Sequence, residues 1–271
     1  MRYIKLAFQY AKGRNFWKLA LITIIPSLFF SFFASFSNVA KFFINFFDYD
    51  IRSFNAIFKE LSDLSWNNLL LMIFSLVIIA IIISIFIGTM QRHMRTGKFA
   101  MKNIFKRINE NFLPTALMLS ILYIMIFVFG FFVSLFVAFW FAVTKIKLAA
   151  FILSAFFALV IFIIMMYLMS LFSLSVPYIV ATGASVFSAA SSSIRNARHH
   201  IKDIFLSILL PLLPLFALEY AVALLDFKPL LLLVDTIFFS FLISYYPILI
   251  FVTYYDIQQL DREDLLPVNR M

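Results

Sequence analysis

The sequence predicts an all-α polytopic membrane protein, and three observations lead to this fold class. The chain has 271 residues, of which 64% are hydrophobic and 13% are charged, whereas soluble proteins are about 45–50% apolar and about 25% charged. Apolar runs of about 20 residues, the length of a membrane-spanning helix, recur along the chain. Lysine and arginine gather in alternate connections between these runs, as they do in proteins that cross a membrane repeatedly. A soluble globular domain is therefore excluded.

Six apolar runs are long enough to cross the hydrocarbon layer, so residues 1–271 are predicted to form a single six-span domain. The runs cover residues 16–36, 67–88, 112–143, 148–175, 204–225 and 230–254. The connections at 144–147 and 226–229 are so short that spans three and four, and spans five and six, are expected to form antiparallel hairpins. The first two spans complete a set of three hairpins. The third run is long enough to tilt or to project beyond the bilayer.

The distribution of positive charge predicts the orientation, because loops rich in lysine and arginine stay in the cytoplasm during insertion. Sixteen of the 22 lysines and arginines lie before or at the first span, after the second and fourth spans, or after the sixth. We therefore expect both termini on the cytoplasmic side of a bacterial cell membrane. The net charge of +9 indicates contact with anionic lipid rather than with nucleic acid. A cleaved signal peptide is the alternative for the first run, but Phe32, Phe33 and Phe36 leave no small-residue cleavage site.

Each hairpin is preceded by a segment with amphipathic helical spacing, which we expect to lie along the cytoplasmic membrane surface. These segments are residues 3–12, 98–112 and 186–202. The second and third follow Gly97 and Gly183, which suit a chain that leaves one helix and turns into another. Cations around the second segment are expected to contact anionic lipids of the inner leaflet. They are Arg92, Arg95, Lys98, Lys102, Lys106 and Arg107.

The connection inside the first hairpin, residues 37–66, is long and rich in phenylalanine. After a possible N-cap at Ser53, apolar residues recur at helical spacing. They are Phe54, Ile57, Phe58, Leu61 and Leu64. Two interpretations stay open: an amphipathic helix on the outer leaflet, or a lid over a path for a lipid or a solute.

The segment TGASVFSAASSSIRNARHHIKDIF, which begins at Thr182, resembles the cytoplasmic segment before the fifth span in a known family. This family is the membrane domain of glycerophosphoryl diester phosphodiesterases and its six-span bacterial relatives. The family repeats Gly, Ser, Ala and Ser at set steps, where this chain has Gly183, Ser185, Ala189 and Ser193. Ser188 stands where the family commonly has an acidic residue. The end YYDIQQLDRED and the basic entry at 92–98 are similar to the same family.

The resemblance extends over most of the chain and implies a six-helix membrane module. It implies no catalysis, because the chemistry of the phosphodiesterases belongs to a separate barrel domain that this chain lacks. Independently of the resemblance, Ser185, Ala189 and Ser193 are four residues apart. They would form one smooth helix edge against which another helix can pack closely.

Two acidic residues lie inside predicted spans, where charge is unfavourable and usually functional. Glu219 lies eight residues before Phe227 in the connecting turn and Asp235 lies eight after it, so both are about 12 Å below the outer end. Held together, they could share a proton or bind a cation. Alternatively, each faces an outer vestibule or pairs with Lys228, Lys145 or a tyrosine hydroxyl. Asp235 also lies near the start of its helix, where the backbone dipole favours negative charge.

Prolines lie inside predicted spans, with Pro26 in the first, Pro211 and Pro214 in the fifth, and Pro247 in the sixth. Each removes a backbone donor and so frees a carbonyl for a neighbouring helix, water or a cation. The last three are candidate helix breaks of the kind found near transporter binding sites. Prolines are also ordinary in membrane helices, so the structural interpretation stays open.

Other chemistry has little support in the sequence. The absence of cysteine excludes disulfides and thiolate catalysis. The three histidines, at 93, 199 and 200, are expected on solvated cytoplasmic faces and have no ligand partners at metal-site spacing, so neither a metal nor a cofactor is expected. Ser191–Ser193 lacks the Gly-x-Ser-x-Gly turn, and Thr96-Gly97-Lys98 lacks the upstream glycine of a Walker motif. We therefore do not expect an enzyme.

Two functional hypotheses follow. The leading one is a non-enzymatic membrane protein that contacts anionic lipid and anchors or regulates a membrane protein partner or forms a homo-oligomer. The alternative is a transporter or lipid-handling protein that uses Glu219, Asp235 and the prolines of the fifth span.

Overall fold

The computed structural model describes residues 2–33, 37–48, 53–62, 66–98, 104–144 and 146–265. Within these ranges every regular element is helical, which confirms the all-α prediction. The elements are α1 (Arg2–Ala11), α2 (Arg14–Phe33), α3 (Ser37–Ile44), α4 (Phe54–Ser62), α5 (Trp66–Thr96), α6 (Ile104–Val143), α7 (Lys147–Phe172), α8 (Ser175–Thr182), α9 (Val186–His199), α10 (Ile201–Leu225), α11 (Lys228–Ile257) and the 3₁₀ helix η1 (Glu263–Leu265).

Five described stretches are long and apolar enough to cross a membrane. They are Ile73–Thr96, Ile108–Val143, Lys147–Thr182, Ile201–Leu225 and Lys228–Ile257. Each coincides with a predicted span, and together they are compatible with a multi-pass membrane protein. The predicted span at 16–36 corresponds to α2, which has 20 residues, and residues 34–36 lie outside the described ranges. The arrangement of six spans in three hairpins stays a prediction.

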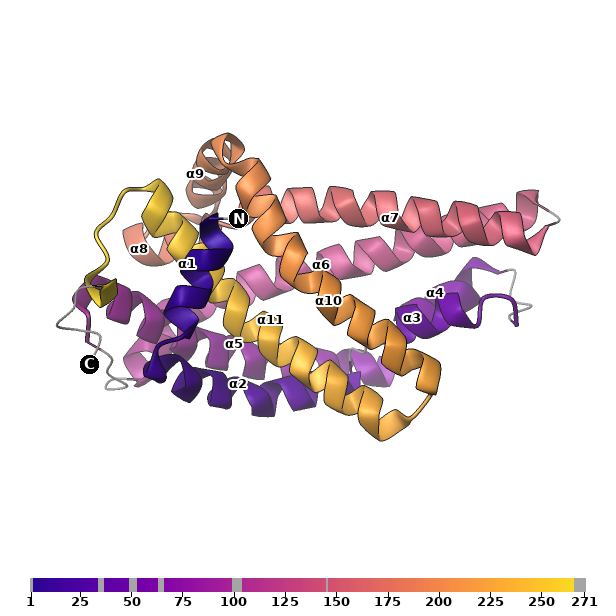
Figure 1. Ribbon diagram of the computed structural model, residues 1–271, viewed down its shortest axis with the longest axis horizontal. Helices are drawn as coiled ribbons and strands as arrows, with labels where there is room; N and C mark the ends of the chain where they lie inside the picture. Colours follow the sequence, from indigo (N-terminus) through magenta and orange to yellow (C-terminus); the bar gives the residue numbers. More distant parts are fainter. Residues whose placement is uncertain are drawn as a thin grey trace.

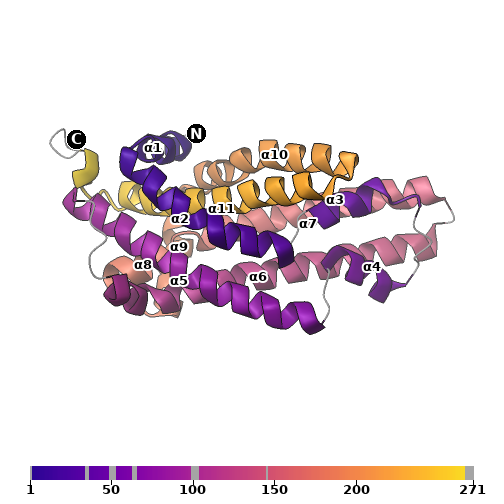
Figure 2. The ribbon, with the colours of Figure 1, turned by 90° about the horizontal axis from the view of Figure 1, so that it is seen from below.

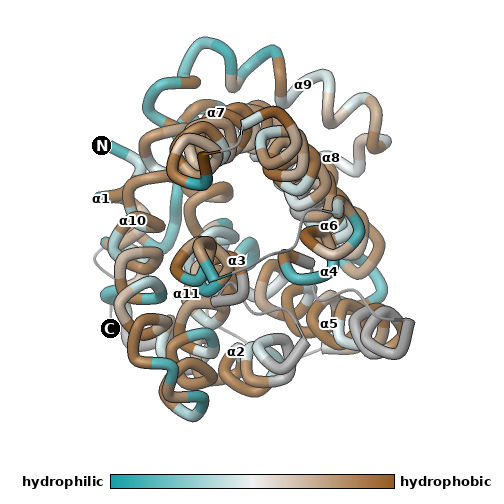
Figure 3. Tube along the Cα trace, turned by 90° about the vertical axis from the view of Figure 1, so that its right-hand side faces the viewer, coloured by the Kyte–Doolittle hydropathy of each residue, from teal (hydrophilic) through white to brown (hydrophobic). Residues whose placement is uncertain are grey.

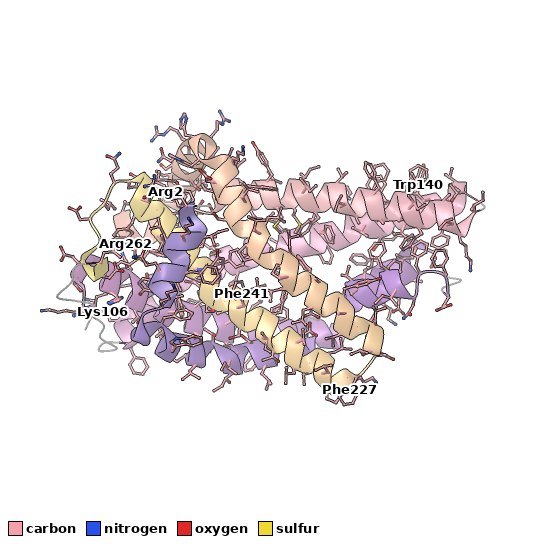
Figure 4. All side chains as sticks on the ribbon, viewed as in Figure 1. Arg2, Lys106, Trp140, Phe227, Phe241 and Arg262 are labelled. Atoms are coloured by element: carbon pink, nitrogen blue, oxygen red, sulfur yellow. The ribbon has the colours of Figure 1, made fainter. Side chains whose placement is uncertain are left out.

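The helices form an elongated bundle with two different ends (Figure 1, Figure 2). Both ends of the described chain lie toward the end that also holds α1, α8, α9 and η1, which we call the terminal end. The connection between α6 and α7 marks the opposite, hairpin end. Arg2, Lys106 and Arg262 lie toward the terminal end, whereas Trp140 lies near the hairpin end (Figure 4). At 40 residues, α6 is about 60 Å long, roughly twice the thickness of a hydrocarbon layer.

Helix α11 forms the core of the bundle. It packs along α2 on one side and α10 on another, and α1 crosses it near the terminal end (Figure 1). Of the residues in its most apolar stretch, 72% are buried, against 17% in the stretch made by α7 and α8. The hairpin of α6 and α7 therefore lies at the periphery, and many of its apolar side chains are exposed. Figure 3 shows that its trace is almost entirely brown, that is, apolar.

Helices α3 and α4 pack against protein at the hairpin end, which corrects the prediction of an amphipathic helix facing the outer leaflet. Their apolar residues are buried between α6 and α7 because phenylalanine rings from both sides interlock. The ring of Phe46 stacks on Phe141 with centroids 5.0 Å apart. The ring of Phe58 meets Phe127 edge to face at 5.4 Å. Leu64, part of the same predicted face, lies outside the described residues.

The three predicted surface segments fold differently from one another. Residues 2–11 form the separate helix α1. Residues 99–103 lie outside the described ranges, and from Ile104 the second segment continues into α6 without a turn. Its described part is therefore the start of a long helix rather than a separate one. The third segment forms α9. Gly97 and Gly183 adopt φ angles of 64° and 69°, as expected for glycines that end helices.

Candidate functional site: a buried carboxyl pair

Glu219 of α10 and Asp235 of α11 meet in the interior, each only 2% exposed. The two carboxyl groups are close enough for their charges to interact. Among the described residues, the Glu219 carboxyl oxygens have no hydrogen-bond partner. The contact follows from the local fold. The two helices are joined by a turn at Asp226 and Phe227, and the acids stand at equal distances from it along antiparallel helices.

Apolar side chains enclose the pair on both sides along the bundle axis. One helical turn toward the hairpin end lies a closed apolar cluster. It consists of Val222, Ala223, Leu231 and Val234, packed against Leu230 and against Ala40 and Ile44 of α3. One turn toward the terminal end, the rings of Phe216 and Phe238 have centroids 5.5 Å apart, and Phe162 of α7 meets Phe216 edge to face. Helix α3 thus covers the pair from the hairpin end.

The lysine of α3 is engaged with another acid. Lys41 Nζ lies 2.6 Å from Asp226 Oδ1, and this hydrogen bond lowers the pKa of Asp226. The ion pair fastens α3 to the turn between α10 and α11. Lys228, a predicted partner of the pair, is exposed and makes no hydrogen bond with Glu219. Lys145 lies outside the described residues.

This arrangement limits the charge that the site can hold. Two ionised carboxylates in contact repel each other, and apolar surroundings make each isolated charge unfavourable. A shared proton or a bound cation removes both difficulties. The pair is therefore suited to bind and release a proton or a small cation, and its chemistry needs no further catalytic group.

The prolines do not break the helices that contain them. Pro211 and Pro214 lie inside the continuous helix α10, and Pro247 lies inside the continuous helix α11. The interpretation of these positions as helix breaks is corrected accordingly.

Tyrosine hydroxyl groups of α11 explain why α10 continues. Pro211 cannot donate to the carbonyl of Ser207 four residues earlier, and the hydroxyl of Tyr245 donates to this carbonyl at 3.3 Å. The hydroxyl of Tyr246 donates to the next carbonyl, that of Ile208, at 2.7 Å. At Pro211 the freed carbonyl is thus occupied by the neighbouring helix instead of being offered to a solute.

Hydroxyl groups join α2 to α11, a contact that the sequence analysis missed. Thr23 Oγ1 lies 3.0 Å from Ser240 Oγ, and Ser31 Oγ lies 3.1 Å from Thr236 Oγ1. Ser27, between them, is fully buried. Small hydroxyl residues allow close approach and hydrogen bonding between apolar helices. Their four-residue spacing, at 23, 27 and 31 and at 236, 240 and 244, was the available signal.

The four residues of the predicted small-residue edge have two different roles: two of them cap helices and two pack against other helices. Gly183 follows the last residue of α8, and the Ser185 hydroxyl accepts a hydrogen bond from the Ser188 N–H at the start of α9. Both Gly183 and Ser185 are exposed. Ala189 and Ser193 are fully buried. Ser193 Oγ donates to the Leu171 carbonyl at 2.7 Å and accepts from the Leu174 N–H at 3.1 Å. Ser193 therefore satisfies backbone groups freed where α7 gives way to α8.

The predicted lipid-contact cations lie near the terminal end, at the end of α5 and the start of α6. Arg92, Arg95, Lys98 and Lys106 are exposed, and Lys106 Nζ is 3.8 Å from the Glu110 carboxylate. Lys102 and the side chain of Arg107 lie outside the description.

The histidines do not share one environment. His93 is half-buried, and its Nδ1 is 3.1 Å from the Tyr10 hydroxyl, which corrects the expectation of a solvated face there. His199 and His200 are exposed. Within the described ranges, no cluster of three or more histidine or acidic residues could hold a metal ion.

Segments from the beginning and the end of the sequence meet around Tyr10 at the terminal end of the bundle. Arg262 and Asp264 form an ion pair at 2.8 Å with side chains 8% and 4% exposed. The Arg262 guanidinium lies over the Tyr10 ring, 5.9 Å from its centroid, and burial raises the pKa of Tyr10. Arg2 pairs with Asp256 of α11. These contacts hold α1 and η1 against α5 and α11, and no sequence pattern pointed to them.

No family model, curated protein or solved structure matches this chain. The resemblance to the membrane domain of the phosphodiesterases therefore stays a prediction.

Proposed function

We propose that the protein is a multi-pass membrane transporter in which movement of the transported molecule is coupled to binding of a proton or a small cation at Glu219 and Asp235. The observation that carries this proposal is the contact between two carboxyl groups, each 2% exposed, between two apolar layers. Ionisable groups held inside apolar bundles are usually part of a proton or ion path. If the acid pair served packing alone, apolar residues of similar volume would stabilise the folded protein equally well or better.

This contact reverses the order of the two hypotheses drawn from the sequence, because anchoring a partner requires no buried acid. The cover formed by α3 adds to the argument. Access to the pair from the hairpin end requires α3 to move away from the apolar cluster that it packs against. At the turn itself, α3 is joined to Asp226 by the ion pair of Lys41, and an exposed pair of this kind is weak enough to open and close. The interpretation of residues 37–66 as a lid thus becomes part of the proposal.

The membrane placement belongs to the same proposal. Of the cations predicted to be cytoplasmic, Arg2, Lys106 and Arg262 lie toward one end of the bundle (Figure 4), which supports a bacterial cell membrane with cytoplasmic termini. The long contact of α2 with α11 supports α2 as a sixth span.

The test uses a hydrophobic carbodiimide, dicyclohexylcarbodiimide, which reacts with protonated carboxyl groups in apolar surroundings. We expect mass spectrometry of the protein in lipid nanodiscs to find the adduct on Glu219 or Asp235. Glu219→Gln with Asp235→Asn should abolish it, whereas Glu60→Gln, at an exposed acid of α4, should not. Protection by rising pH alone indicates a proton, and protection by Na⁺ or K⁺ indicates a cation. An unmodified pair at every pH would refute the proposal.

Anchoring remains the second candidate because of one observation. The hairpin of α6 and α7 is largely uncovered along a length greater than a hydrocarbon layer. This length supports a contact with a second membrane protein or another copy of the chain. A stoichiometric complex in nanodiscs, seen by native mass spectrometry, would favour it.

A further inference from the structure

Helix α9 lies across the long axis of the bundle at its terminal end (Figure 1, Figure 3). The side of α9 that faces α7 and α8 consists of small residues. Ala189, Ser193 and Ala197 are fully buried. The side of α9 that carries small residues is thus buried against the protein and is not available to a membrane. A molecule that binds α9 must therefore contact the opposite, outward side of the helix.

The outward side of α9 and the start of α10 are cationic, and the first turn of α9 carries exposed apolar side chains. The exposed cationic or titratable residues are Arg195, Arg198, His199, His200 and Lys202. Asp203 is the one acidic residue in the sequence between Gly183 and Glu219. Phe187, at the start of α9, is 90% exposed. A cationic face with an exposed aromatic residue is typical of helices that lie in a membrane interface.

The position of α9 relative to α7 indicates its depth. Exposed apolar side chains follow α7 up to its last residue, Phe172. At that point Ser193 of α9 hydrogen-bonds to the backbone of Leu171 and Leu174. The cations of α9 are therefore held where the apolar surface of α7 ends, which is the level of lipid phosphate groups if that surface faces hydrocarbon.

We propose that α9 and the start of α10 form a binding surface for anionic phospholipid, in which Arg195, Arg198 and Lys202 bind headgroup phosphates and Phe187 enters the acyl region. Charge complementarity, the transverse direction of α9 and its level at the edge of the apolar surface carry this assignment. A soluble acidic partner would account for the charge alone and for neither of the other two observations. The inference depends on a bilayer around the bundle and is independent of the carboxyl pair.

The first experiment measures the depth of Phe187. Because the chain has no cysteine, Phe187→Cys provides a unique site for a nitroxide label, with Asp261→Cys as an exposed control near the same end. In nanodiscs containing phosphatidylglycerol, electron paramagnetic resonance should find the label at 187 more accessible to oxygen than to a water-soluble nickel complex. The label at 261 should behave in the opposite way. Equal, water-like accessibility at both positions would overturn the proposal.

The second experiment measures lipid preference. Arg195→Gln with Arg198→Gln should reduce the phosphatidylglycerol retained in native mass spectrometry several-fold relative to phosphatidylcholine. Arg92→Gln with Arg95→Gln makes the same change in charge on exposed residues of α5 and should leave most of the preference intact. The sequence pattern predicted that Arg92 and Arg95 contact anionic lipid. The comparison therefore shows whether the arginines of α5 or those of α9 determine the lipid preference. An equal loss in both variants, or no loss in the α9 variant, would overturn the proposal.

Discussion

The hairpin of α10 and α11 and the hairpin of α6 and α7 are both pairs of long apolar helices, yet α11 lies at the core of the bundle, whereas α6 and α7 lie at its periphery. In α11, 72% of the residues in the apolar stretch are buried, against 19% in α6. Helix α11 is also the more polar one, because it holds Asp235, the tyrosine hydroxyl groups that donate to α10, and the hydroxyl groups of Thr236 and Ser240 that contact α2. The peripheral hairpin is more uniformly apolar.

This difference reverses the rule for soluble proteins, in which apolar residues identify the core. In a bundle whose surroundings are as apolar as its interior, burial of leucine gives no preference for the inside. Polar groups must instead find partners within the protein. The helix with the most hydroxyl and carboxyl groups therefore becomes the centre, and the four predictions below test this contrast.

The largest effect is expected at the carboxyl pair. Glu219→Gln with Asp235→Asn should abolish proton or cation binding, because the amides cannot exchange a charge. The same variant should unfold at a higher temperature, since two neutral amides can hydrogen-bond to each other and remove the cost of a buried charge. Isothermal titration calorimetry with acid, Na⁺ or K⁺ and thermal unfolding measure the two effects. If this variant still bound protons or cations, Glu219 and Asp235 would not be the binding site.

The next effect is expected where α2 meets α11. Ser27→Phe places a ring in a fully buried contact, and overpacking of this kind destabilises by about 1–3 kcal/mol. Ser120→Phe on the exposed side of α6 should change stability by less than about 0.5 kcal/mol. Unfolding in detergent with increasing denaturant compares the two. Equal losses would mean that the two hairpins do not differ in packing.

A smaller effect is expected for the hydroxyl that supports α10. Tyr246→Phe removes the hydrogen bond to the Ile208 carbonyl and should destabilise by about 1 kcal/mol. Tyr167→Phe, on the exposed side of α7, is the matched control and should be nearly neutral. Hydrogen exchange of the amides around Pro211 should increase only in the Tyr246 variant. Unchanged exchange would show that the tyrosine does not support the helix at Pro211.

The smallest effect on stability is expected at the exposed pair of Lys41 and Asp226. Because the hydrogen bond lowers the pKa of Asp226 below its ordinary value of 3.8, its contribution is present above that value and is lost as the pH falls through the lowered pKa. Asp226→Asn should therefore flatten the acid side of the stability profile slightly. Glu60→Gln should not. If α3 is a cover, Asp226→Asn should also speed carbodiimide labelling of Glu219 at neutral pH.

The sequence by itself determined the helices and several of their ends. Apolar length predicted the five stretches that the structure contains, because hydrogen bonding of the backbone in an apolar solvent leaves few alternatives to helix. Gly97 and Gly183 were expected at turns because they tolerate positive φ. The shared depth of Glu219 and Asp235 followed from counting residues on both sides of one short turn.

Only the tertiary structure decided which side of each helix meets protein. Residues 37–62 could have faced lipid, but Phe46 and Phe58 pack on α6 and α7. Pro211 could have opened α10, but Tyr245, 34 residues further along the chain, binds the freed carbonyl. The position of a residue along its helix is set by the local sequence, whereas the residues that it contacts belong to segments far away in the chain. In a chain that is apolar on nearly every side, periodicity alone cannot distinguish a face that meets lipid from a face that meets another helix.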